Sequence, residues 1–118
     1  MNYYVFPGLS NSAQICARLG VKEADPFFII KRTCEALNLD INKLTSPFRG
    51  RDYTEARFII VGLILTIDKK MTLKRMGKML GGRDHATVIY SRKMYNDLES
   101  TNKEFREKVK LVKEFCLN

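Results

Sequence analysis

The sequence has 118 residues, which is enough for one domain with a single core and too short to hold most ATP-driven machinery as well. Its 21 Lys and Arg residues outnumber 13 Asp and Glu residues, and the formal net charge of +8 favours a polyanionic partner, although many basic proteins are merely soluble.

The cysteines and the N-terminus exclude two further classes of protein. Cys16, Cys34 and Cys116 form no C-x-x-C pair, and the chain has a single histidine, so neither a disulfide framework nor a metal site is supported. We expect reduced cysteines in the core. The N-terminus lacks the pattern of a signal peptide, and the longest apolar run, residues 58–67, is about half as long as a membrane span. We therefore expect a cytoplasmic protein with no membrane partner.

The surplus of positive over negative charge is confined to the middle of the chain. Residues 1–40 hold four basic and four acidic residues, and residues 97–118 hold five of each. The whole surplus lies in residues 41–96, where twelve basic residues face four acidic ones. Interleaved signs in the last segment are typical of a solvated surface, whereas the middle segment predicts a patch of one sign.

Residues 1–24 give mixed signals, with a strand-prone YYVF and a short helical pattern at residues 12–19. The first helix with a clear start follows them. Asp25 and Pro26 predict an N-cap and a first helical residue, and the one-sided pattern continues to Leu39. A short element at residues 40–44 leads into TSPFRGRD, which we expect to be a loop.

Residues 54–68 are almost wholly apolar over FIIVGLILTI. Their Ile and Val content also fits a buried strand, but the length and the flanking Leu, Ala, Arg and Glu favour a central helix buried on most sides.

Two helices with a glycine turn between them come next. Thr72 predicts the N-cap of a helix over residues 73–80, in which Gly77 implies a close helix contact, and Gly81 and Gly82 predict its end. Asp84 predicts the N-cap of a second helix that runs to about residue 98. Its expected inward residues are Val88, Ser91, Tyr95 and Leu98.

The last helix is expected over residues 103–115, with Phe105, Val109, Val112 and Phe115 on one side. The sequence therefore predicts an all-α domain of five or six helices.

The glycine turn inside the basic block predicts a helix-turn-helix. In such a unit the first turn of the second helix enters the major groove, so Asp84, His85, Ala86 and Thr87 would lie nearest to base edges. A carboxylate can accept from cytosine or adenine amino groups, histidine can donate or accept, and methyl groups can pack on a thymine methyl. The N–H groups at the start of the helix suit a phosphate.

The stretch GGRDHATVIYSRK resembles the signature of the C-terminal DNA-binding domain, domain IV, of the bacterial replication initiator DnaA. MTLKRMGKML resembles the first helix of that domain's helix-turn-helix, EARFIIVGLIL its central helix and SPFRGRD its basic loop. The resemblance implies a compact TrpR-like helical bundle that reads a nine-base-pair box at a replication origin. It covers about residues 31–115, so residues 1–30 are expected to be an N-terminal extension of unknown role and residues 31–118 a stand-alone copy of the domain.

The resemblance also implies residue roles. Arg49 matches the arginine of the basic loop that reaches into the minor groove, and Arg57 matches a phosphate-contacting arginine at the start of the central helix. Asp84 and His85 match the base readers, with Ala86 beside them, and Thr87 matches a backbone contact. Further phosphate contacts are expected from Arg51, Lys74, Arg83, Arg92 and Lys93.

Three departures from the family pattern bear on the base sequence that is read. Ala86 replaces the usual Ser or Thr, Phe58 stands where Gln is common, and the turn at residues 68–71 is one residue longer than usual. We expect the binding mode to survive these changes and the preferred sequence to differ.

Other functions are less well supported by the sequence. The chain has no G-x-x-x-x-G-K-[ST] motif, so we expect no nucleotide, no cofactor and no enzymatic activity. Asp84 as a plain N-cap, and Tyr90 and Tyr95 as stacking platforms for single strands, remain minor alternatives. The main alternative is a protein-interaction module that binds a replication initiator or a replisome component, which Ala86 and Phe58 favour.

Overall fold

The computed structural model describes residues 25–117, and within this range the chain forms six helices and no strand. The predicted all-α class is confirmed. The strand and short helix predicted in residues 1–24, and Cys16 with them, lie outside the described range. The helices are α2 (Pro26–Leu37), α3 (Ile41–Leu44), α4 (Arg51–Ile67), α5 (Leu73–Met79), α6 (His85–Thr101) and α7 (Lys103–Leu117).

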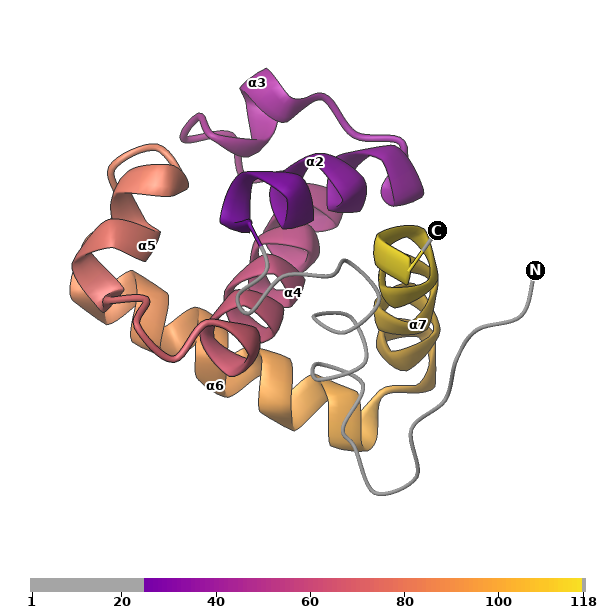
Figure 1. Ribbon diagram of the computed structural model, residues 1–118. Helices are drawn as coiled ribbons and strands as arrows, with labels where there is room; N and C mark the ends of the chain where they lie inside the picture. The colour runs from indigo at the N-terminus through magenta and orange to yellow at the C-terminus, as the bar shows by residue number, and fades with distance from the viewer. Residues whose placement is uncertain (1–24, 118) are drawn as a thin grey trace.

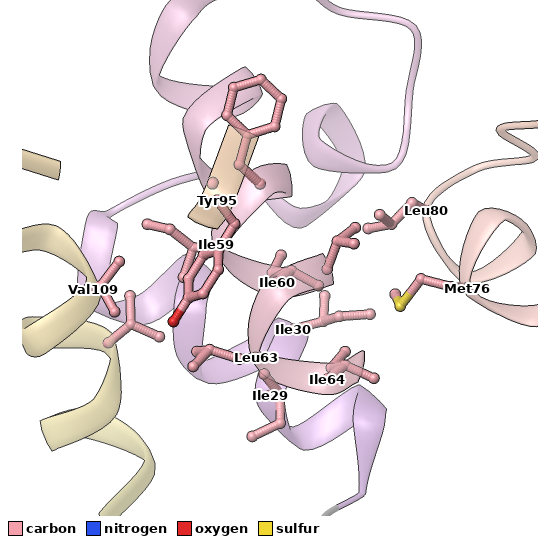
Figure 2. Close-up of a cluster of buried hydrophobic side chains, with 14 of the residues drawn as sticks. Ile29, Ile30, Ile59, Ile60, Leu63, Ile64, Met76, Leu80, Tyr95 and Val109 are labelled. Atoms are coloured by element: carbon pink, nitrogen blue, oxygen red, sulfur yellow. The ribbon is translucent and has the colours of Figure 1, made fainter. Parts of the chain in front are cut away.

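Helix α4 is the centre of the domain: α2, α3 and α6 pack against it, and α7 packs on α2 and α6 (Figure 1). Ile59, Ile60, Leu63 and Ile64 are at most 1% exposed, because α4 has neighbours on most of its sides (Figure 2). Gly62 lies where α4 crosses α6, and a Cβ there would overlap the Tyr95 ring. The prediction of a central helix instead of a buried strand is therefore confirmed.

Helix α4 begins earlier than the predicted residue 54. Gly50 occupies the N-cap position without a side-chain cap, and Asp52 in the first turn has the charge that the helix dipole favours. Arg51 Nε also lies 3.0 Å from the Glu55 carboxylate one turn later. The expectation that Arg51 and Asp52 belong to a loop was wrong.

Helix α2 starts as predicted, with the Asp25 carboxylate accepting a hydrogen bond from the Phe27 backbone N–H at 3.0 Å. It contributes Ile29 and Ile30, which are 0% and 2% exposed, to the core against α4 and α7. The packed unit therefore includes α2 from Pro26, and the domain boundary expected between residues 30 and 31 falls inside this helix.

Helix α7 buries Phe105, Val109 and Val112 as predicted. Its fourth core residue is Cys116, which is 0% exposed, whereas Phe115 is only half-buried. The reason is that the helix continues to Leu117, so the position four residues after Val112 returns to the core. Cys34 and Cys116 are free thiols, and burial raises the pKa of each to about 11.

In the part of the chain that the structure describes, none of the helices is long and apolar enough to span a bilayer.

Candidate nucleic-acid interface

Helices α5 and α6 are joined by a short turn that glycine makes possible. The Thr72 hydroxyl caps α5 by accepting from the Arg75 N–H at 3.1 Å. Gly81 and Gly82 then have φ angles of 92° and 85°, which L side chains rarely adopt. The Gly77 carbonyl accepts from the N–H groups of Gly82 and Arg83, each at 2.9 Å. The predicted glycine turn is confirmed.

Gly77 and Gly81 also allow the turn to pack closely on its surroundings. A Cβ at Gly77 would overlap the carbonyl oxygen of Arg83, and one at Gly81 would overlap that of Thr45. The close contact expected at Gly77 is therefore present, but its nearest neighbour is the backbone of the turn and not another helix. Through Gly81 the turn rests on the loop that follows α3.

The first turn of α6 points its side chains away from the core. The Asp84 carboxylate accepts from the Thr87 N–H at 2.9 Å, and this bond holds the pKa of the carboxyl below its usual value. Asp84, His85, Ala86 and Thr87 are exposed, whereas Val88, Ser91 and Tyr95 are buried. Asp84 is thus an N-cap whose carboxylate stays accessible to a partner.

Two basic hollows lie on either side of this first turn. One, of about 670 Å³, is formed between the loop before α4, the start of α4, the glycine turn and α6, and its lining includes Arg49, Arg57, Arg83, Thr87 and Tyr90. The other, of about 730 Å³, lies between α5 and α6, and its lining includes Lys74, Lys78, Arg83, His85 and Ala86.

Arg57 has a structural role that the sequence did not indicate. The residue is 6% exposed. Its Nε donates to the Leu44 carbonyl at 2.8 Å, and its Nη2 donates to the carbonyls of Lys43 at 3.1 Å and Ser46 at 3.0 Å. Burial, followed by the charge of Arg83, lowers its pKa to about 10, so the guanidinium stays charged at neutral pH. Only Nη1 is left unused by these bonds for the phosphate contact that the resemblance implied.

Arg83 ties the same loop to the glycine turn. Its Nη2 donates to the Ser46 carbonyl at 2.8 Å, and its Nη1 donates to the Leu80 carbonyl. Partial burial lowers its pKa. Because Arg57 and Arg83 share the Ser46 carbonyl, they tie Ser46, three residues before Arg49, to the start of α4 and to the glycine turn. Sequence reasoning treated both arginines as surface charges.

The remaining predicted residues are placed differently from one another. Lys74 lines the hollow beside α5, and Arg92 and Lys93 are exposed farther along α6. Arg51 lines neither hollow and pairs with Glu55 beside α7, which raises its pKa. The structure therefore does not bring Arg51 to the face that carries the first turn of α6.

Lys78 and Ile89 at this face were not among the predicted site residues, and Tyr90 was predicted only in the minor alternative, as a stacking platform for single strands. Lys78 lies one helical turn after Lys74, and that spacing could have identified it. Ile89 and Tyr90 are 54% and 55% exposed on α6. Within residues 25–117 no group of His, Cys, Asp and Glu side chains is arranged to hold a metal ion.

The comparisons with known proteins agree with this arrangement. Residues 27–94 match the sequence profile of the family described as Bacterial dnaA protein helix-turn-helix. The chain is 28% identical over 94 residues to the chromosomal replication initiator protein DnaA of Thermus thermophilus. The aligned segment covers 80% of this chain and 21% of that protein. It is 33% identical over 84 residues to the protein of the same name from Ehrlichia ruminantium, covering 71% of this chain and 18% of that protein. The chain thus spans about a fifth of the length of these relatives.

Proposed function

Because the chain belongs to the bacterial DnaA helix-turn-helix family, we propose that it binds double-stranded DNA in replication initiation or its regulation and reads a DnaA-box-like sequence. One observation carries this proposal. The exposed first turn of α6 projects between two hollows lined by arginine and lysine, as expected for a helix tip that enters a groove between two phosphate backbones.

Base reading is assigned to the tip of α6. Asp84, His85 and Ala86 face solvent there, and each has the chemistry to contact a base edge in the major groove. Their positions are fixed by the N-cap bond of Asp84 and by the glycine turn. A rigid tip of this kind gives a reader a defined register on the duplex.

Minor-groove reading is assigned to Arg49. It is exposed on the loop that Arg57 and Arg83 hold, so its side chain is free while its backbone is tethered. Phosphate contacts are assigned to Lys74, Arg83, Thr87, Arg92 and Lys93. Arg57 can make such a contact only through Nη1, since its Nε and Nη2 donate to backbone carbonyls. Arg51 can make one only when its side chain leaves the ion pair with Glu55.

The test is a selection of bound duplexes from a random pool, followed by affinity measurements by fluorescence anisotropy. The expected result is one enriched motif, bound at least 10³-fold more tightly than random duplex of the same length. Failure to enrich any sequence, with the same affinity for a DnaA-type box and for random duplex, would overturn the specific-reader proposal.

A second function is favoured by one observation. The exposed Ile89 and Tyr90 suit an interface with a replication initiator or a replisome protein, as well as a DNA groove. A protein partner that is retained after nuclease treatment, together with no duplex binding at low salt, would establish this function in place of the first.

A further inference from the structure

Phe48, which is 45% exposed, lies beside Arg49 in the loop before α4. The Lys43 ammonium of α3 lies 5.3 Å from the centroid of the Phe48 ring, within the range of a cation–π contact. The Tyr53 ring of α4 is edge-on to the Phe48 ring, with centroids 5.1 Å apart and an interplanar angle of 90°. Tyr53 is itself held, since its hydroxyl accepts from the Asp40 N–H at 3.0 Å. The Phe48 ring is therefore attached to both α3 and α4.

The Phe48 ring also determines the course of the backbone around Arg49. Gly50, the N-cap of α4, lies directly against the ring, because a Cβ there would overlap it. The φ angle of Gly50 is −55°, which any residue adopts, so the contact with the ring and not the backbone conformation requires a glycine. On the other side, the Phe48 N–H donates to the Ser46 hydroxyl at 3.2 Å, and the Ser46 carbonyl accepts from two arginines. Arg49 thus leaves the loop from a backbone that is held on both sides.

A fixed backbone matters for an arginine that reads a narrow groove. None of the carboxylates in residues 25–117 pairs with Arg49, so the direction of its side chain depends on its backbone. The minor groove is only about 6 Å wide, and a small shift of the backbone moves the guanidinium out of it. Each mobile backbone bond also lowers the fraction of conformations that can bind, because ordering the loop then opposes binding.

We propose that Phe48 is a positioning residue for minor-groove reading: its ring, held by three neighbours, fixes the backbone from which Arg49 reaches the duplex. This role rests on the proposed duplex-binding function and on the part that Arg49 has in it. Phe48 does not insert into the duplex itself, because its ring is already used for contacts within the protein. Loss of the ring lowers the contribution of Arg49 and leaves base reading by α6 unchanged.

The experiment changes the minor groove of the selected duplex and leaves its major groove intact. Each adenine is replaced, one at a time, with diaminopurine, which pairs with thymine and adds the amino group that guanine presents in the minor groove. At the base pair that faces Arg49, the wild-type protein should bind the substituted duplex about tenfold more weakly, the effect of one wrong base pair. Arg49→Ala should show no such penalty, and Phe48→Ala should keep only a minor part of it.

Two further variants separate positioning from direct contact with DNA. Phe48→Ala in the Arg49→Ala protein should cause no additional loss of duplex affinity, because Phe48 acts through Arg49. Gly50→Ala leaves Phe48 in place but displaces its ring, and it should lower the minor-groove penalty as Phe48→Ala does. An additional loss of affinity in the double variant would mean that Phe48 touches the duplex, and would overturn the positioning role.

Phe27→Ala provides a matched control, since Phe27 is a 63%-exposed phenylalanine on α2, outside the loop. It should reproduce the wild-type penalty at every adenine. Replacement of thymine with deoxyuridine, which removes a methyl group from the major groove, should affect wild type, Phe27→Ala and Phe48→Ala alike. A general loss of structure in Phe48→Ala would change this major-groove response as well, and would contradict a role limited to Arg49.

The outcomes distinguish the role of Phe48 from the proposed function. The same minor-groove penalty in wild type and Phe48→Ala would overturn the role of Phe48 alone. A tightly bound duplex with no sensitive adenine in the wild type would overturn minor-groove reading by Arg49, and the role of Phe48 with it, while base reading by α6 would stand. A pool from which no duplex is enriched would overturn the proposed function.

Discussion

Two regions of the domain use basic residues in opposite ways. Where α4 begins beside α7, cations are matched by carboxylates: Arg51 lies 3.0 Å from Glu55, and Lys108 Nζ lies 3.2 Å from Glu55 and 3.7 Å from Asp52. On α5 and α6 the basic residues have no such partners, since the ion pairs found within residues 25–117 include none of them.

The difference separates cations that serve the fold from cations that remain available to a ligand. Surface ion pairs contribute little stability, so the pairs beside α7 mainly neutralise that face. The unpaired cations beside the tip of α6 keep their field, which attracts a polyanion. Figure 1 shows α6 running from beside α5 to α7, so one helix connects the two regions.

The largest effect is expected from Arg57→Ala, which removes a buried cation that serves the fold. The carbonyls of Lys43, Leu44 and Ser46 would each lose one donor, and the loop that carries Arg49 would lose one of the two arginines that hold it. The free energy of unfolding should fall by about 3 kcal/mol in urea denaturation.

Arg57→Lys sharpens this prediction. Lysine keeps the charge but cannot present the same fork of donors to three carbonyls, so it should recover only a minor part of the stability. The exposed ion-pair residue provides the contrast: Arg51→Ala should change stability by less than about 0.5 kcal/mol. If both Arg57 variants were as stable as the wild type, the bonds from Arg57 to the loop carbonyls would not stabilise the fold, and this role of Arg57 would be refuted.

The next largest effect concerns the turn that sets the tip of α6. Gly77→Ala would place a Cβ on the carbonyl oxygen of Arg83, and should cost about 2 kcal/mol and weaken duplex binding, because the tip is displaced. Gly82→Ala has open space around it and carries only the strain of its positive φ, about 1 kcal/mol. Thermal unfolding of both variants measures this difference, and the reverse order would contradict the close packing at Gly77.

At the tip itself, His85→Ala should leave stability unchanged and lower the preference for the selected duplex over random duplex by about tenfold. Lys93→Ala, an exposed cation on the same helix, should instead weaken both duplexes to the same degree. Anisotropy titrations with the two duplexes distinguish these patterns. An equal loss on both duplexes for His85→Ala would make histidine another phosphate contact.

The smallest effect is a pH dependence. The pKa of Asp84 is held below its ordinary value of 3.8 by the bond from Thr87, so its carboxylate contributes stability that is complete above that value. This contribution is lost as the pH falls through the lowered pKa. Asp84→Asn, which keeps a capping acceptor, should have a slightly lower melting temperature than the wild type at pH 6, and the gap should narrow as the pH falls below 3.8. A gap that stays constant across this range would rule out the linkage.

The sequence predicted the helices well wherever local chemistry determines them. Asp25, Thr72 and Asp84 are N-caps as predicted, because each side chain bonds to a backbone N–H two or three residues later. The glycine turn followed from the backbone freedom of Gly81 and Gly82. Errors arose at the start of α4 and the end of α7, where an i,i+4 ion pair and core packing extend the helices beyond the visible pattern.

The candidate site was predictable in outline only. The exposed tip of α6 followed from its helical period, but Arg49, Arg51 and Arg57 look alike in sequence and have three different environments: free, ion-paired and buried. The carbonyls that hold Arg57 belong to residues 11 to 14 positions away, and no local pattern records such a contact.

The most direct test of the difference between the two regions is the salt dependence of duplex affinity for two double variants of equal charge. Lys74→Ala with Lys93→Ala removes two exposed cations from the α5–α6 face, and Lys103→Ala with Lys110→Ala removes two from α7. The slope of log K against log salt should become shallower by about 1.8 for the first pair and stay at the wild-type value for the second. If both pairs change the slope equally, net charge alone drives binding, and the face around the tip of α6 is not the DNA-binding surface.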